Sequence, residues 1–268
     1  MFVAWLASLG APVMAQEAGI TARLHPWAKF NPGVWKLVRV ATETRDDQGR
    51  WTNASTADTR TTLVDVDNDA ATLEIETCME VAGKRFQAEP QILRQRFCGE
   101  LAVPNVSSKE PVDGQVVIEE RTIPCKMQSW EIVSANERTN LRLYYSPTVW
   151  PYVLKREYTM TDPEGKHVLS QTTVEVIALD LPIRVQGETH NGAYVKTVTK
   201  NAKGIMTTLA MVLPGIPGGV VRHSMKEVDK SGRVVRRGTL ELLDYNANPE
   251  DRPFNRKRSS RRSKSAPR

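Results

Sequence analysis

The chain has 268 residues, of which 40% are hydrophobic and 25% charged, and its formal net charge is +6. This composition is typical of a folded protein and excludes a wholly disordered chain. No apolar stretch reaches the roughly 18 residues that a membrane-spanning helix needs, which argues against an integral membrane protein built from helices. The length fits one large β domain or two ordinary domains.

The first residues are typical of a secretory signal peptide. Residues 1–16 carry no charged side chain, Phe2–Val13 form a short apolar stretch, and Ala15 is a small residue that a signal peptidase accepts. We therefore expect residues 1–15 to be a cleaved signal peptide, and the mature protein to be exported, periplasmic or extracellular. The basic residues that usually precede the apolar stretch are missing, so a buried N-terminal strand or helix is the alternative.

Short segments with alternating apolar and polar residues recur from residue 24 onward. Residues 61–66, 71–76 and 172–177 are rich in Thr, Val, Leu and Ile, and their period of two predicts strands with one face in a core and the other in water. Turn residues separate such segments, and no convincing amphipathic helix is present. The sequence therefore predicts an all-β protein of about 12–14 strands. We expect an antiparallel curved sheet, an open barrel or a sandwich, built from repeated long hairpins.

One hairpin unit is repeated within the chain. Residues 146–155 resemble residues 213–222 at an offset of 67 residues, and the same offset carries Asp162-x-x-Gly165 onto Asp229-x-x-Gly232. Asp46-x-x-Gly49 is a weaker third copy. Asp at the first position accepts backbone hydrogen bonds in a type I turn, and Gly at the fourth adopts the left-handed conformation of a G1 bulge. Each copy is therefore expected to be a long hairpin with this turn at its tip.

Two segments interrupt the strand pattern and suggest the organisation of the chain. Residues 99–114 contain Pro104, Pro111 and two adjacent serines, and are predicted to be a linker or long loop. This segment separates a first β unit, residues 24–98, from a second, residues 115–247, which holds the 67-residue repeat. From residue 248 onward the apolar periodicity is lost, and residues 248–268 are predicted to be a disordered basic tail.

The positive charge of the chain lies in that tail. Between residues 252 and 268 there are eight basic and no acidic side chains, so the rest of the chain has a net charge of −2. A segment of this kind binds phosphates or acidic sugars by releasing their counterions. We expect the tail to bind an anionic polymer or a membrane surface, without sequence-specific nucleic-acid recognition. The residues expected to carry this binding are Arg256, Lys257, Arg258, Arg261, Arg262 and Lys264.

The three cysteines are Cys78, Cys98 and Cys125, and export would permit a disulfide between two of them. Cys78 and Cys98 flank a predicted hairpin whose turn lies at residues 82–84, so we expect this pair to form the disulfide. Cys98–Cys125 is a close alternative, and three buried, reduced cysteines are a third. The chain has no Cys-x-x-Cys sequence, which leaves a zinc ribbon without support.

The sequence contains no recognisable motif for catalysis or for cofactor binding. It has no nucleophile elbow, no P-loop, no dinucleotide-binding glycine motif and no metal-binding histidine spacing, so we predict no catalytic, metal-binding or cofactor-binding residues. The aromatic residues near the repeated strands are expected in the core. An apolar ligand groove or a carbohydrate platform is the alternative for this set, which comprises Trp27, Trp35, Trp130, Trp150, Tyr144, Tyr145 and Tyr152.

The Asp-x-x-Gly hairpins follow an apparent signal peptide, and Ser146–Pro151 and Leu213–Gly218 precede apolar strands. This pattern resembles exported bacterial proteins built from open, strongly curved β-sheets, such as the half-barrels of the lipoprotein-carrier and localisation factors of the LolA/LolB type. The resemblance implies a curved sheet whose concave face shelters an acyl chain, with a lipid or a lipoprotein as partner. It carries over no site residues.

These patterns favour an exported, non-enzymatic β protein that binds an apolar ligand or a partner in the cell envelope. The alternative is an envelope structural or adhesive module that its basic tail tethers to polyanions. An enzyme ranks third, because no motif supports one.

Overall fold

The computed structural model describes residues 25–67, 70–81, 83–96 and 106–249, and all the regular structure within these ranges is β-strand. No helix in these ranges has the length and apolar character that crossing a membrane requires. The strands are β1 (Trp35–Arg45), β2 (Trp51–Val66), β3 (Ala70–Val81), β4 (Lys84–Gln87), β5 (Gln91–Arg96), β6 (Val106–Ser108), β7 (Val112–Ile118), β8 (Arg121–Val133), β9 (Arg138–Tyr145), β10 (Val153–Thr161), β11 (Val168–Val185), β12 (Glu188–Asn201), β13 (Gly204–Val212), β14 (Val220–Asp229) and β15 (Val234–Asn246).

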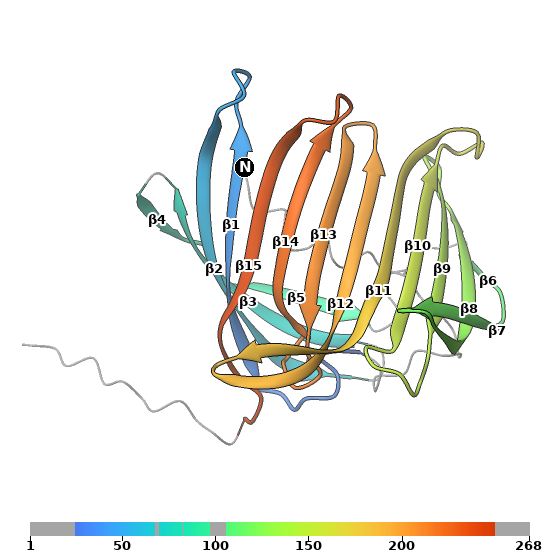
Figure 1. The fold of residues 1–268 in the computed structure, drawn as a ribbon, viewed down its shortest axis with the longest axis horizontal. Helices are drawn as coiled ribbons and strands as arrows, with labels where there is room; N and C mark the ends of the chain where they lie inside the picture. Colours follow the sequence, from blue (N-terminus) through green and yellow to red (C-terminus); the bar gives the residue numbers. More distant parts are fainter. Residues whose placement is uncertain (1–24, 68–69, 82, 97–105, 250–268) are drawn as a thin grey trace, which may run out of the picture.

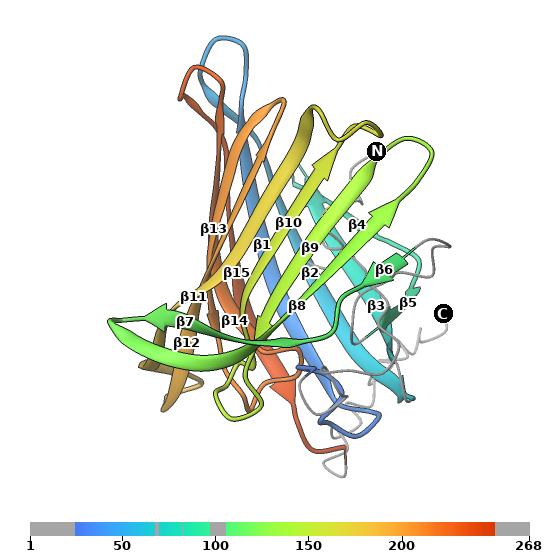
Figure 2. The same ribbon diagram turned by 90° about the vertical axis from the view of Figure 1, so that its right-hand side faces the viewer.

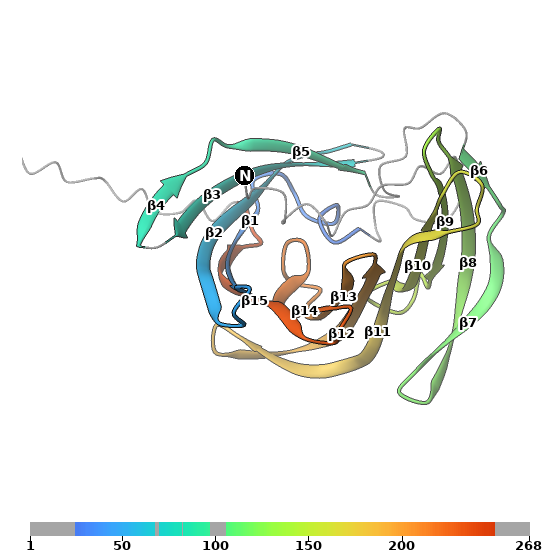
Figure 3. The same cartoon turned by 90° about the horizontal axis from the view of Figure 1, so that it is seen from above.

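The strands form one antiparallel sheet that curls on itself, as Figure 1 and Figure 3 show from the side and from above. Its order is β4-β3-β2-β1-β15-β14-β13-β12-β11-β10-β9-β8-β6, with β5 also paired to β3 and β7 to β8. Because β1 pairs with β15, strands from residues 24–98 and from residues 115–247 lie in the same sheet. The predicted all-β, curved antiparallel sheet of long hairpins is confirmed.

The described ranges hold fifteen strands, slightly more than the sequence predicts. The additional elements are short strands at the two edges of the sheet, β4 and β5 on β3 and β6 on β8. Such short segments show too few alternations for a period of two to be recognised. Within residues 99–114, predicted as a linker or long loop, the structure places β6 and the first residues of β7.

Three hairpin tips at one end of the sheet close with the same hydrogen bonds. In each, the Gly N–H donates to the Asp carbonyl oxygen, over 2.9 Å from Gly49 to Asp46, 2.9 Å from Gly165 to Asp162 and 3.0 Å from Gly232 to Asp229. In each, the Asp carboxylate also accepts the N–H of the following Arg or Lys. All three glycines have φ between 74° and 83°, a left-handed conformation that glycine adopts without steric cost. These are the Asp-x-x-Gly turns that the sequence predicts.

Two loops at the opposite end of the sheet, residues 146–152 and 213–219, also share one hydrogen-bond pattern. The N–H of Ser146 donates to the carbonyl of Tyr152, and the N–H of Leu213 donates to the carbonyl of Gly219, both over 2.8 Å. Tyr152 has φ 73° and Gly219 has φ 74°. Corresponding residues are 67 positions apart, so the resemblance between the two segments extends to their backbone conformation.

A segment before β1 and one of these loops together form what we call the floor of the curl, residues 25–34 and 213–219. In Figure 1 they lie at the end opposite the hairpin tips, and in Figure 3 they lie within the outline of the curl. Trp27 and Val34 of the floor are buried against Leu63 and Leu73 of the sheet. The N–H of Gly218 donates to the carbonyl of Pro26 over 3.2 Å, which joins the two parts of the floor.

The ends of two long hairpins pack against the sheet near the floor. Ile183, in the last part of β11, is buried with Leu213 and Val221. The β7–β8 hairpin, seen edge-on in Figure 2, buries Ile118 and Ile123 in a cluster with strands β10 to β13. These two clusters fix both hairpin ends through apolar burial, which is worth about 25 cal/mol per Å².

We predict that Gly192→Ala destabilises the protein by about 1–3 kcal/mol, because a methyl group there overpacks the junction of β11, β12 and β13. A Cβ at Gly192 would lie 2.5 Å from the carbonyl oxygen of Val212 and 2.7 Å from a Leu213 methyl group. Gly215→Ala is the matched control, since nothing lies within 4 Å of its Cβ position. The midpoint of urea unfolding measures the effect, and equal midpoints for the two variants would show that this junction is not tightly packed.

Candidate functional site

Strand alternation gives the sheet two faces, and the floor shows which one is inner. Leu63 and Leu73 lie opposite each other on β2 and β3, and both belong to one buried cluster with Trp27 of the floor. The register carries this inner face around the sheet through one row of side chains: Val40, Leu240, His223, Ala210, Val195 and Val176. Side chains in register with this row are therefore inner, and their direct neighbours along each strand are outer.

The outer face carries charged side chains that pair between and along strands. Lys155 lies 2.7 Å from Glu157, and Lys196 lies 3.7 Å from Glu175 on the neighbouring strand. Further outer pairs are Arg39–Asp58, Arg142–Glu157, Arg222–Glu241 and Arg237–Glu43. Because these groups are in contact with water, each pair adds little stability, but together they keep the outer face hydrated.

The inner face is lined mainly by small and apolar side chains. Most of them are half-buried, so solvent still reaches them. Threonines on neighbouring strands pair with each other, and the hydroxyl groups of Thr172 and Thr199 lie 3.0 Å apart. Members of this inner set are Val40, Thr42, Thr172, Val174, Val195, Thr197, Thr199, Met206, Thr208, Ala210 and Met225.

Four charged side chains belong to the inner face on β1, β10, β14 and β15: Lys36, Arg156, Glu227 and Arg236. Glu227 and Arg236 form an ion pair at 3.4 Å, near the hairpin tip that connects their strands. Lys36 and Arg156 form no ion pair with any residue that the structure describes. On these four strands, the inner face therefore carries two positive charges that no described residue neutralises.

Lys36 lies against the floor. Its ammonium group is 5.4 Å from the centre of the Trp27 ring, within the range of a cation–π contact. Burial lowers the pKa of Lys36 to about 8, because removing the ammonium group from water disfavours its charged form. At neutral pH Lys36 still carries its charge.

Arg156 belongs to the same inner surface on β10. Burial lowers its pKa, although a guanidinium stays protonated at any pH at which the protein is folded. His25 of the floor is itself buried, and its pKa falls to about 4, chiefly through burial and further through the charge of Arg156. His25 is thus neutral at pH 7, and it accepts the N–H of Trp27 at Nδ1 over 3.3 Å.

Two polar groups on β8 are buried without a hydrogen-bond partner among the described residues. Gln128 is 2% exposed and Trp130 is 4% exposed, and neither Gln128 Oε1 nor Trp130 Nε1 has a partner. Gln128 lies opposite Leu143, which lies opposite Arg156, so these groups belong to one region of the inner face. Leaving such groups unpaired costs about 1–3 kcal/mol each, which makes this region a candidate for contact with a polar ligand group.

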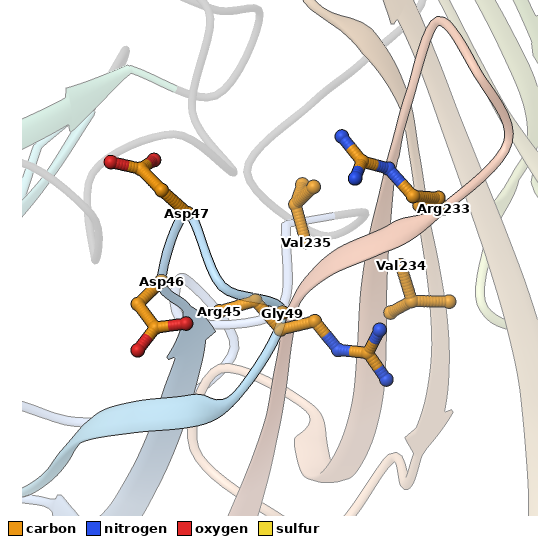
Figure 4. Close-up of a pocket in the computed structure, with 7 residues that line it drawn as sticks. All are labelled: Arg45, Asp46, Asp47, Gly49, Arg233, Val234 and Val235. Atoms are coloured by element: carbon orange, nitrogen blue, oxygen red, sulfur yellow. The ribbon is translucent and has the colours of Figure 1, made fainter.

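A hollow of about 210 Å³ lies between the tips of the β1–β2 and β14–β15 hairpins (Figure 4). The carboxylate of Asp46 accepts the N–H groups of Gln48 and Arg50 of its own turn, and Arg233 pairs with Asp229 at 3.1 Å. In Figure 4 the carboxylates of Asp46 and Asp47 point away from the Arg233 guanidinium. These charges therefore support the two turns, and we do not assign a ligand to the hollow.

The two cysteines that the structure describes, Cys78 and Cys125, do not belong to the inner-face region described above. Cys78 is on β3, and the turn after this strand is at Gly83 as predicted, but β5 then runs away from Cys78 and places Arg96 opposite Ala70. Cys98 lies outside the described residues, so the Cys78–Cys98 disulfide stays a prediction. Cys125 is buried in the cluster around Ile123, and this burial raises the pKa of its thiol.

The predicted tail residues Arg256, Lys257, Arg258, Arg261, Arg262 and Lys264 also lie outside the described residues, as does the predicted signal peptide, residues 1–15. Sequence reasoning missed Lys36 and Arg156. A signal for both exists: Lys36 alternates with Val38 and Val40, and in Lys155-Arg156-Glu157 one of three adjacent charges must face inward. Among the described residues, no group of His, Cys, Asp or Glu side chains is arranged to hold a metal ion.

No protein-family model matches the chain, and no curated protein matches it. Two solved structures are similar to it. One, from Bacteroides fragilis, is described as an exported protein with a YmcC-like fold; the identity is 9% and the TM-score 0.34, over 81% of this chain and 97% of that one. The other, from Parabacteroides distasonis, is described as a lipoprotein; the identity is 12% and the TM-score 0.36, over 85% of this chain and 100% of that one. Both TM-scores are too low to define the fold or function of this chain, and the resemblance to the lipoprotein carriers stays a hypothesis.

We predict that the free energy of unfolding rises with pH between about 4 and 6.5, because the unfolded chain binds a proton at His25 in this window and the folded chain does not. The full contribution is about 3 kcal/mol. His25→Gln should flatten this part of the profile. Urea unfolding across the pH range measures the free energy, and an NMR titration of His25 with a midpoint near 6.5 would contradict the burial argument.

Proposed function

We propose that the chain is an exported, non-enzymatic protein that binds an apolar ligand on the inner face of its curled sheet. The observation that supports this most directly is the difference between the two faces. The outer face carries charged pairs such as Lys155–Glu157 beside some exposed apolar side chains such as Leu209, whereas the inner face presents mainly threonine, valine, alanine and methionine side chains that solvent still reaches. The apolar stretch Phe2–Val13 before Ala15 supports export.

Burial energetics favour an apolar occupant for this face. Covering exposed hydrocarbon is worth about 25 cal/mol per Å², so a bound hydrocarbon chain gains affinity in proportion to the inner surface that it covers. The threonine hydroxyls do not oppose this, because the hydroxyl groups of pairs such as Thr172 and Thr199 bond to each other. A flexible acyl chain can bend to follow the concave inner face. A flat surface of a partner protein cannot follow this curvature.

The test compares two neighbouring residues on opposite faces of β12. We predict that Thr197→Glu weakens binding of N-phenyl-1-naphthylamine, an uncharged apolar fluorophore, by about tenfold or more, since a carboxylate in an apolar contact loses several kcal/mol of hydration. Val198→Glu is the matched control, because Val198 faces outward beside Thr173 and Thr207. Fluorescence titration gives the affinities, and circular dichroism checks the fold.

Equal binding by these two variants would contradict the assignment of the ligand to the inner face, and no binding by the unmodified chain would contradict the proposed function. Should Thr197→Glu not fold, Thr208→Glu on β13 tests the same row of side chains, since Thr208 lies opposite Thr197. Organic extraction of the purified protein, followed by mass spectrometry, identifies any apolar molecule that co-purifies. An acyl-containing molecule at one per chain would support the proposal.

A second function rests on the distribution of charge. The tail from residue 252 to residue 268 carries eight basic and no acidic side chains, which favours attachment to anionic surfaces or polymers of the envelope. Attachment through the tail is compatible with ligand binding by the sheet. If the sheet binds no ligand, attachment through the tail alone would make the chain an adhesive module of the envelope.

We predict that truncation after Ala247 removes nearly all retention on heparin, because the remaining chain has a formal net charge of 0. Retention of the full chain should fall steeply with salt, with a slope on the order of −5 in a logarithmic plot, since counterion release scales with the number of cations engaged. Elution across a salt series measures both effects. Undiminished retention of the truncated chain would place the anion affinity on the folded sheet.

A further inference from the structure

We propose that the ligand of the inner face is an amphiphile with an anionic head group, and that Lys36 and Arg156 bind this head group beside the floor of the curl. This inference rests on the proposed function and adds the polar half of the ligand to it. The structural basis is the placement, on the inner face, of two buried cations that no described residue neutralises.

Lys36 is held in place without a counter-ion from the part of the chain that the structure describes. Its ammonium group contacts the Trp27 ring at 5.4 Å, and a Cβ at Gly218 would lie 2.9 Å from it, so the group lies between the two parts of the floor. The cation–π contact contributes about 0.5–2 kcal/mol and saturates none of the three N–H donors of the ammonium group. Those donors remain for an anion.

Arg156 lies on the inner face of β10, opposite Val174 of β11 and Leu143 of β9. His25 lies near enough to the Arg156 guanidinium to be affected by its charge, and His25 is bonded to the backbone of Trp27, which carries the ring under Lys36. The three residues His25, Pro26 and Trp27 thus connect the two cations. His25 is neutral at pH 7 and does not add a third charge, and neither does it neutralise the other two.

Arg236, the inner cation near the open end of the curl, differs from Lys36 and Arg156 because it has a counter-ion. Arg236 is paired with Glu227 at 3.4 Å, so there the chain supplies its own counter-ion. At the floor it supplies none among the described residues, although burial makes an unpaired charge more costly there. The unpartnered N–H of Trp130, buried on β8 two strands from β10, is a further donor for an anionic oxygen.

Carboxylate and phosphate head groups share this chemistry, since both accept several N–H donors with a negative charge. Twelve-carbon probes separate them: dodecanoate, dodecyl phosphate and uncharged dodecanol, each measured by displacement of N-phenyl-1-naphthylamine from the full chain. We expect at least one anionic probe to bind about tenfold or more tightly than dodecanol at low salt, because a hydrogen bond to a charged group is worth about 1.5–3 kcal/mol. The stronger of the two anions identifies the head-group class.

Substitutions assign the preference to the two cations. Arg156→Met and Lys36→Met should each reduce the anion-to-alcohol preference by about tenfold and leave dodecanol binding unchanged. Lys155→Met is the matched control, since Lys155 is the outer-face neighbour of Arg156 and pairs with Glu157. Arg156→Lys should retain most of the preference, which keeps the test decisive if Arg156→Met does not fold.

The outcomes separate this inference from the proposed function. Equal affinity of the unmodified chain for dodecanol and both anions would overturn the head-group site and leave the apolar ligand in place. An anion preference that persists in both Arg156→Met and Lys36→Met would also overturn it, because the anion would then bind elsewhere. Failure of the fluorophore and of dodecanol to bind at all would overturn both.

Discussion

The short connection between the two edges of the sheet constrains the whole structure. β5 and β6 lie on opposite edges, yet only residues 97–105 separate them in the sequence. Ten Cα–Cα steps reach at most about 36 Å, whereas the twelve strand spacings between β5 and β6 in a flat sheet would cover about 58 Å. The edges can be joined only if the sheet curls, so chain length alone imposes a concave and a convex face.

Curvature then decides which side chains suit each face. Side chains converge on the concave side, which favours threonine, alanine and glycine, and a Cβ at Gly238 would already lie 3.0 Å from the carbonyl oxygen of Ala41. Side chains diverge on the convex side, where long charged residues such as Lys155 and Glu157 have room to reach each other and water. The chemical contrast between the faces, on which the proposed function depends, is thus also a steric consequence of the curl.

The local elements could be predicted from the sequence, whereas their long-range arrangement could not. The turn at Asp46 follows from four consecutive residues, because the Asp carboxylate and the left-handed Gly49 define it without help from the rest of the fold. The pairing of β1 with β15 joins segments about 200 residues apart, for which no local pattern exists. Lys36 and Arg156 could be recognised as inward-facing only once the sheet had a defined inner face. The same limit applies to Cys78: its hairpin turn was predictable, but the register that places Arg96 opposite Ala70 was not.

The two cations are informative because no described residue neutralises them, and the contact with Trp27 offsets the cost of burial for Lys36 alone. A buried charge without a partner reduces the stability of the folded state, and an apolar residue of similar size would remove that cost. Trp27 does not require Lys36 for its burial, since Leu63 and Leu73 already pack against its floor segment. The chain also shows, with Glu227 and Arg236, that this face can accommodate a carboxylate where one is needed for balance. A charge that is costly to the empty protein, and that no described residue compensates at the floor, is best explained by a ligand that brings the opposite charge with it. On this argument, the threonine-lined face accounts for the apolar part of the ligand, and the two cations determine where its head group lies.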